Sequence, residues 1–171
     1  MGNRFIERMT MLEISLDDGD LQRGLGQLLR NARHPRPMMR AIAAELLSIT
    51  EDNFESESWG GKKWPANARG GKILQKSGQL AASIHTASGS NFARIGTNKP
   101  YAAIHQFGGT VKAKNKPYLV FKVGDGFRRV KQVKIPARPY LPISKGGTLQ
   151  AGAESRLLDV ALDALARGVR K

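Results

Sequence analysis

Apolar residues recur at helical spacing near both ends of the chain but not in its middle, and this division restricts the fold more than any other feature. After Pro37, which suits the first turn of a helix, Ile42, Leu46 and Ile49 form one stripe with a period near 3.6 residues. The spacing predicts a helix that ends near Glu57. A preceding helix that stops before Pro35 is predicted by four leucines: Leu21, Leu25, Leu28 and Leu29.

Two more elements belong to these end regions. Gly146-Gly147-Thr148 is expected to open a last helix. Its predicted apolar stripe is Leu158, Leu162, Leu165 and Val169, with Leu157 and Ala161 alongside. Its predicted solvent-exposed face is Glu154, Arg156, Asp159, Asp163 and Arg167. Near the N-terminus, apolar residues alternate over 10–16, which predicts a short half-buried strand.

In the middle of the chain, short segments typical of strands alternate with turn residues, as in a β region. Residues 58–76 predict a long loop around two tryptophans, residues 83–87 and 92–96 a pair of strands, and residues 100–107 one or two helical turns. Three more strands are expected over 110–115, 118–123 and 128–135, the last two forming a hairpin at Gly124-Asp125-Gly126. Pro136, Pro139 and Pro142 favour an extended edge segment, because proline cannot donate to a sheet.

The order of these elements predicts an α+β fold in a single domain over 1–171. We expect a small curved, mostly antiparallel sheet packed by two N-terminal helices and one C-terminal helix, with long loops. The expected parts are a strand and two helices over 10–57, a Gly/Lys/Trp loop over 58–76, a basic sheet region over 77–147 with a long hairpin over 110–135, and a last helix over 148–171.

Charge is divided along the chain. Residues 58–147 carry 17 Lys and Arg but one acid, Asp125, whereas the whole chain has a net charge of +14. Paired-carboxylate chemistry is therefore excluded within this middle region. The chain has no Cys, which excludes disulfides and thiolate zinc sites. We predict no catalytic residue, cofactor or metal, and no membrane partner, because no run approaches the roughly 20 apolar residues that span a bilayer.

The basic residues of the middle region fall on the expected hairpin. On a strand, alternating residues project from one face, so Lys112, Lys114 and Lys116 would form a row. Across the hairpin, the same positively charged surface would also include Arg128, Arg129, Lys131 and Lys134. Such a surface is a solvated strand face that blocks aggregation, a site for a polyanion such as nucleic acid, or a contact for an acidic protein. The charge pattern leaves these alternatives open.

Five segments in register resemble a known family. They are Trp64-Pro65, Ser77-Gly78-Gln79-Leu80, Ile95-Gly96-Thr97-Asn98, the run PYAAIHQFGG over 100–109 and the run IPARPYL over 135–141. Together they are similar to the phage virion morphogenesis family, the Mu-like prophage tail completion proteins. The flanking helices suit the same layout, so the resemblance extends over about 10–170.

The resemblance implies a non-enzymatic structural subunit of a tailed-phage virion. Such a subunit completes the tail or forms the neck, joining tail to head as a ring of copies, a hexamer or dodecamer, around the DNA channel. Its partners would be copies of itself, neighbouring neck, connector and tail proteins, and DNA in nonspecific contact. Its place would be the neck/tail junction of the virion, after synthesis in the host cytoplasm. The alternatives are a tail terminator that caps the tail tube and, from charge alone, a sequence-nonspecific nucleic-acid-binding protein.

The resemblance also suggests roles for the quoted residues. Tyr101 and Phe107 are expected to pack inward, and His105 and Gln106 to satisfy backbone groups at the short helix. Gly108-Gly109 is expected to permit a sharp exit from that helix. These six residues are expected to form one structural motif together with Pro136, Arg138 and Pro139. Trp59 and Trp64 are expected to pack on the domain or on a neighbouring subunit, as a loop interface.

Overall fold

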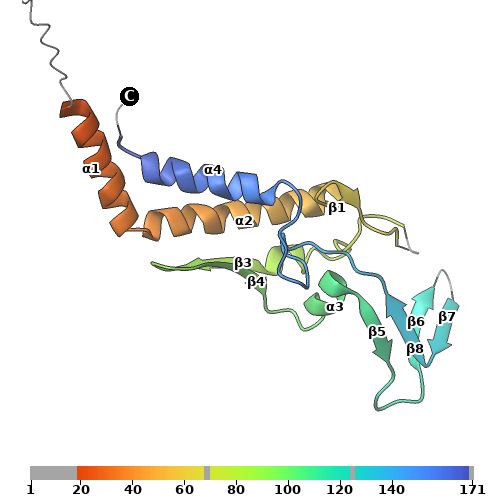
Figure 1. The fold of residues 1–171 in the computed structure, drawn as a ribbon. Coiled ribbons are helices and arrows are strands. Elements are labelled where there is room, and N and C mark those ends of the chain that lie inside the picture. The colour runs from red at the N-terminus through yellow and green to blue at the C-terminus, as the bar shows by residue number, and fades with distance from the viewer. Residues whose placement is uncertain (1–18, 68–69, 124–125, 170–171) are drawn as a thin grey trace, which may run out of the picture.

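The computed structural model describes residues 19–67, 70–123 and 126–169, so the strand expected over 10–16 lies outside the described residues (Figure 1). Its helices are α1 (Gly19–Arg33), α2 (Arg36–Ser56), α3 (Ala102–Phe107) and α4 (Ala153–Ala166). The first two occupy the predicted positions and are separated at His34-Pro35. Proline lacks the N–H that a helix interior needs, so one helix ends before it and the next begins after it.

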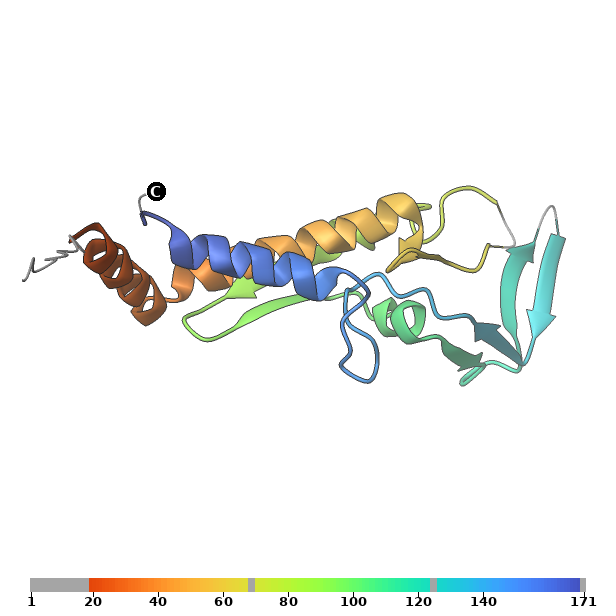
Figure 2. The same ribbon diagram turned by 45° about the horizontal axis from the view of Figure 1, so that its top comes forward.

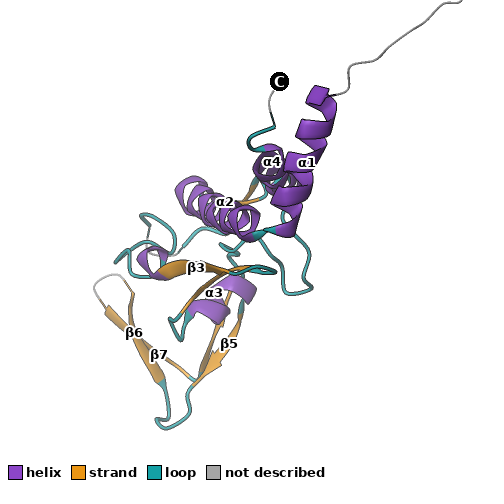
Figure 3. Cartoon of the chain, turned by 90° about the vertical axis from the view of Figure 1, so that its left-hand side faces the viewer, coloured by secondary structure: helices purple, strands orange, loops and turns teal. Residues whose placement is uncertain are grey.

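Helix α2 is the central element of the fold. It contacts α4 along one side and β3 (Ile84–Ser88) and β4 (Ala93–Thr97) along another. Figure 3 shows α1, α2 and α4 on one side of β3, with α3 on the other side. The buried residues of α2 follow helical spacing: Ala43, Leu46, Ile49, Thr50, Asn53 and Phe54.

Helix α4 differs from the sequence expectation in its start and in its buried face. Residues 143–149 form a loop closed by a bridge between Ile143 and Leu149, so the helix begins at Ala153 and not at Gly146. The fully buried residues of the helix are Ala153 and Ala164, whereas Leu158 and Leu162 are 56% and 52% exposed. The predicted apolar stripe is therefore wrong at Leu158 and Leu162. Leu165 and the residues expected alongside the stripe, Leu157 and Ala161, are half-buried.

The described strands form four separate antiparallel ladders of two strands each, which confirms the α+β class. The ladders pair β1 (Ser58–Trp59) with β2 (Lys62–Lys63), β3 with β4, β5 (Gly109–Lys112) with β8 (Gln132–Ile135), and β6 (Leu119–Val123) with β7 (Gly126–Val130). Residues 58–76, which were expected to be entirely loop, thus begin with a hairpin whose two strands have two residues each. The expected β3–β4 pair is confirmed.

Residues 109–135, named the arm here, project from the helical frame (Figure 2). The strand expected over 128–135 is interrupted at Lys131, where pairing changes from one partner strand to another. The β6–β7 hairpin is therefore nested beyond the β5–β8 ladder. None of the arm residues whose side chains are described is buried. These arm residues are consequently exposed or half-buried.

The core lies between α2, α3 and the proline-rich segment over 136–142. Its buried residues are Phe54, Trp64, Ile73, Leu80, Ala102 and Tyr140. Phe54 stacks on Tyr140 with 5.3 Å between ring centroids and meets the edge of Trp64 at 5.9 Å. Tyr140 is 1% exposed, so the proline-rich segment passes through the core instead of forming the expected edge strand.

Candidate functional site

The proline-rich segment is held mainly by side chains. Its prolines cannot donate to a sheet, so the segment forms no regular ladder with a neighbouring strand. Its buried carbonyl groups therefore need donors from elsewhere. The indole Nε1 of Trp64 donates to the carbonyl of Pro139 at 2.7 Å, and that of Trp59 donates to the carbonyl of Leu141 at 2.9 Å. Both tryptophans thus pack on their own chain, which is one of the two expected alternatives. Trp64 is buried and Trp59 is half-buried.

Gln106 is the residue that fixes this segment most completely. Its Oε1 accepts hydrogen bonds from the backbone nitrogens of Tyr140 at 2.9 Å and Leu141 at 3.0 Å, and its Nε2 donates to the carbonyl of Ile143 at 2.9 Å. The side chain is buried. Gln106 thus satisfies backbone groups, but these lie on residues 140–143 and not at the short helix where they were expected.

Asn53 on α2 holds the same segment from the opposite side. Its Nδ2 donates to the carbonyl of Tyr140 at 3.0 Å and to Oε1 of Gln150 at 2.7 Å. Gln150 donates back to the Asn53 side chain at 3.1 Å, and both residues are buried. Sequence reasoning missed this pair, because a single Asn within a helical stripe carries no local signal of its distant partner.

The other residues of the corner differ from their expected roles. Tyr101 and Phe107 are 39% and 46% exposed, so they do not pack inward. His105 meets the edge of the Tyr101 ring at 6.0 Å, and its buried Nδ1 has no hydrogen-bond partner. Burial and, to a smaller extent, the charge of Arg138 lower the pKa of His105. The His105 backbone, by contrast, pairs with Arg138, whose N–H donates to the His105 carbonyl at 2.8 Å.

Arg138 joins the proline-rich segment to the loop that follows Trp64. Its Nε donates to the carbonyl of Pro65 and its Nη2 to that of Ala66, both at 2.8 Å. Burial lowers the pKa of this guanidinium. Its hydrogen bonds go to backbone carbonyls, so Arg138 serves the structure of the corner.

The glycines after α3 have the expected conformation. Gly108 has a φ of 68° and a ψ of 179°, a region that is essentially restricted to glycine. A Cβ placed there would lie 2.7 Å from the backbone nitrogen of Ala137 and 3.1 Å from the carbonyl oxygen of Ile135. Gly108 therefore allows the chain to turn from α3 into β5 against the proline-rich segment, where Pro136 is exposed and Pro139 is half-buried.

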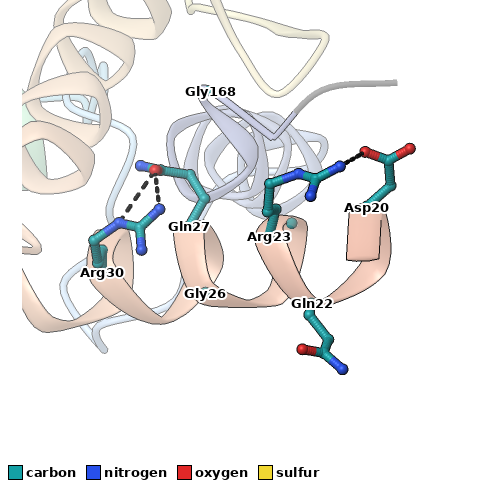
Figure 4. Close-up of a pocket in the computed structure, with 8 residues that line it drawn as sticks. Asp20, Gln22, Arg23, Gly26, Gln27, Arg30 and Gly168 are labelled. Atoms are coloured by element: carbon teal, nitrogen blue, oxygen red, sulfur yellow. Dashed lines mark hydrogen bonds and ion pairs between the residues drawn. The ribbon is translucent and has the colours of Figure 1, made fainter. Parts of the chain in front are cut away.

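The surface of the described residues has shallow depressions. One is lined by Tyr101, His105, Arg138 and the loop over 70–77. Another lies along α1 beside Gly168, where Arg30 donates to Gln27 at 2.7 Å and Arg23 pairs with Asp20 (Figure 4). Among the described residues, no three His, Asp or Glu side chains are placed to hold a metal ion, and no helix is long and apolar enough to cross a membrane.

The structure places the predicted basic residues of the arm on different faces. Lys112 and Lys134 share one face of β5–β8, because the residues opposite them in the ladder are Gln132 and Thr110. Arg128 and Arg129 are adjacent in β7 and therefore project to opposite faces. The remaining three predicted residues, Lys114, Lys116 and Lys131, lie outside the strands. The predicted row of Lys112, Lys114 and Lys116 is thus wrong, because β5 ends at Lys112.

One face of the β6–β7 hairpin combines cations with apolar side chains. Val120 lies opposite Arg129, and Lys122 lies opposite Phe127. All four side chains are exposed, with Val120 at 57% and Phe127 at 75%. Sequence reasoning included only Arg129 in its basic surface. Alternation on both sides of the Gly-Asp-Gly turn was the signal that could have identified the other three.

Comparisons with known proteins give a consistent relationship. The model of the phage virion morphogenesis family matches residues 16–165. Mu-like prophage FluMu G protein 2 of Haemophilus influenzae is 37% identical over 134 residues, covering 77% of this chain and 83% of that protein. The putative capsid assembly protein G of Escherichia phage Mu is 33% identical over 150 residues, covering 80% of this chain and 86% of that protein. No solved structure matches this chain.

Proposed function

Because the chain belongs to the phage virion morphogenesis family, we propose that it is a non-enzymatic structural subunit that completes the tail of a tailed phage. In this proposal, copies form a ring around the DNA channel at the neck, where the ring joins the tail to the head. Its partners there are further copies of this chain and the adjacent neck, connector and tail proteins. A role in building the phage particle is the part that family membership itself supplies.

The projecting arm is the observation that best supports an assembly role. The arm carries large exposed apolar residues, including Tyr118, Val120 and Phe127, whose exposed fractions are 45%, 57% and 75%. Exposed apolar patches on an extended element are typical of surfaces that are covered by a partner. The corner around Gln106 explains how the arm is anchored, because the β5 and β8 ends of the ladder connect to α3 and to the buried proline-rich segment.

The basic residues of the arm have two candidate duties in a neck ring. They line the DNA channel, or they contact an acidic surface of another virion protein. Phosphate contacts release counterions, so binding to DNA must weaken as salt rises. If residues such as Lys112 and Lys134 line the channel, the purified protein binds DNA of any sequence at low salt. Absence of binding at low salt, or binding that does not respond to salt, would reject the DNA contact.

Electron microscopy of particles made without this protein tests the proposed function. If the protein completes the tail, particles made without it should be filled heads and separate tails of normal length. Tails of irregular length would instead indicate a tail terminator, the alternative within the same class. Absence of normal heads would indicate the role in the name of the phage Mu relative, capsid assembly. Normal joined virions would refute a structural role at the neck.

A further inference from the structure

The outward side of α4 carries two adjacent pairs of side chains that have no partner within the described chain. Leu158 and Leu162 are one turn apart and more than half exposed. Asp159 and Asp163 form a second exposed pair one turn apart. Asp159 precedes Leu162 by three residues, a spacing that makes the two pairs neighbours on the helix surface. Neither aspartate has an ion pair among the described residues. This combination of two leucines and two aspartates is named the α4 outer face.

The exposed face of the β6–β7 hairpin has the matching composition. Val120 and Phe127 supply apolar surface, and Lys122 and Arg129 supply positive charge. Opposite residues in an antiparallel ladder have Cβ atoms about 4.5–5.5 Å apart, so these four side chains form one compact patch. This patch is named the hairpin outer face.

The two faces of one chain do not meet. Figures 1 and 2 show β6–β7 at the end of the arm, away from α4 and beyond α3. An isolated copy therefore leaves both faces in water. Two faces that are separate on one chain and complementary in composition are the requirement for a head-to-tail contact between copies.

We propose that the hairpin outer face of one copy docks on the α4 outer face of the next. The proposal rests on the proposed ring, which it deepens by naming the contact that builds it. Val120 and Phe127 cover Leu158 and Leu162, while Lys122 and Arg129 approach the two aspartates. Apolar contact removes the leucines from water, and the charges set the orientation of the two copies. Arg167 lies beyond the last residue of α4 and thus outside this face.

Charge reversal on each face tests the contact on the full chain. Lys122→Glu with Arg129→Glu, or Asp159→Lys with Asp163→Lys, should weaken self-association at least tenfold in sedimentation velocity over a concentration series. The chain that carries all four substitutions should regain self-association, because opposite charges again face each other. An equimolar mixture of the two double variants should also associate. Lys62→Glu with Lys76→Glu makes the same change of charge on exposed residues away from both faces, and it should leave self-association intact.

The native chain has no cysteine, so cross-linking gives an independent measurement. A chain with Phe127→Cys and Leu162→Cys should form a ladder of linked species with a short bis-maleimide. Either single substitution should give little product, because like faces do not meet in a head-to-tail contact. Circular dichroism spectra that match the native protein exclude misfolding as the cause of any loss.

The outcomes distinguish a failure of the proposed head-to-tail contact from a failure of the proposed ring. Rings that are insensitive to every reversal, or a fourfold variant that is not restored, overturn the contact and leave the ring. A dimer that depends on both faces supports the contact and overturns the ring. A protein that is monomeric at all concentrations overturns both. Reversals that spare self-association but release DNA or another virion protein assign the hairpin outer face to that partner and likewise overturn the contact.

Discussion

Replacing Gln106 by methionine should destabilise the protein strongly, because this side chain satisfies backbone groups that have no alternative partner. Gln106→Met keeps the approximate volume of the side chain but removes its amide. The backbone N–H groups of Tyr140 and Leu141 then lose their acceptor, and the carbonyl of Ile143 loses its donor. Tyr140 is 1% exposed, so bulk water does not reach its N–H group directly.

The magnitude follows from the two orphaned donors. A buried polar group left without a partner costs about 1–3 kcal/mol. The N–H of Tyr140 is buried and that of Leu141 is half-buried, so the combined loss is about 2–4 kcal/mol. Domains are stable by roughly 5–15 kcal/mol, and the loss is therefore a large fraction of the total. For a chain of this size each kcal/mol lowers Tm by about 2–4 °C, which gives a decrease of about 4–16 °C.

Urea denaturation followed by circular dichroism measures this loss as a lower midpoint with an unchanged slope. The matched control is Gln132→Met, since Gln132 lies exposed on β8 and should tolerate the change within about 0.5 kcal/mol. A loss below about 1 kcal/mol for Gln106→Met, or one equal to that of the control, would refute the reasoning. It would mean that the buried segment finds other acceptors.

Two further substitutions test the same corner. Gly108→Ala should cost about 2 kcal/mol or more, because its φ and ψ favour glycine and the added Cβ would lie 2.7 Å from a backbone nitrogen; Gly96→Ala, where a Cβ meets nothing within 4 Å, is the control in the same urea titration. The depressed pKa of His105, due to burial and then to Arg138, means that the unfolded chain binds the proton more readily. The contribution of His105 to stability should thus be full above the unfolded pKa of about 6.5 and should fall as pH decreases through it, and His105→Gln should reduce this fall. Equal pH dependence of the native protein and His105→Gln would contradict the assignment.

Local signals were sufficient for α1, for α2 and for the turn after α3. The period of α2 and the break at Pro35 are properties of a few adjacent residues, and they identified α1 and α2 correctly. Gly108 and Gly109 were recognised for the same reason, since a reversal of the chain after a short helix needs positive φ. These features depend on backbone preferences that the sequence carries directly.

The packed face of α4 could not be chosen from the sequence, because the helix has two apolar stripes. One contains Leu157 and Ala161, and the other contains Leu158 and Leu162. The packed arrangement also brings Arg156, which was expected on the solvent-exposed face, against α2, where it donates to Glu45 at 2.5 Å and to Asp52 at 2.7 Å. These partners are more than 100 residues away in sequence, so no local pattern reveals them.

The course of the proline-rich segment was missed for a similar reason. Three prolines exclude a central strand, and an edge position is the usual alternative. Here the segment is buried because Gln106, Asn53 and the two tryptophans replace the missing ladder with side-chain hydrogen bonds. Sequence reasoning found three of these four residues individually. Their convergence on one segment is a property of the tertiary structure.

The division of charge gives the proposed head-to-tail contact its direction. With a net charge of +14, two copies repel at long range, but at physiological salt this repulsion is screened beyond about 8 Å. At contact distance the sign depends on which faces meet. Two hairpin outer faces would bring Lys122 and Arg129 against their equivalents, and two α4 outer faces would do the same with aspartates. Repulsion thus excludes both symmetric pairings of like faces, and only the pairing of unlike faces remains attractive, which is the arrangement from which a ring can close.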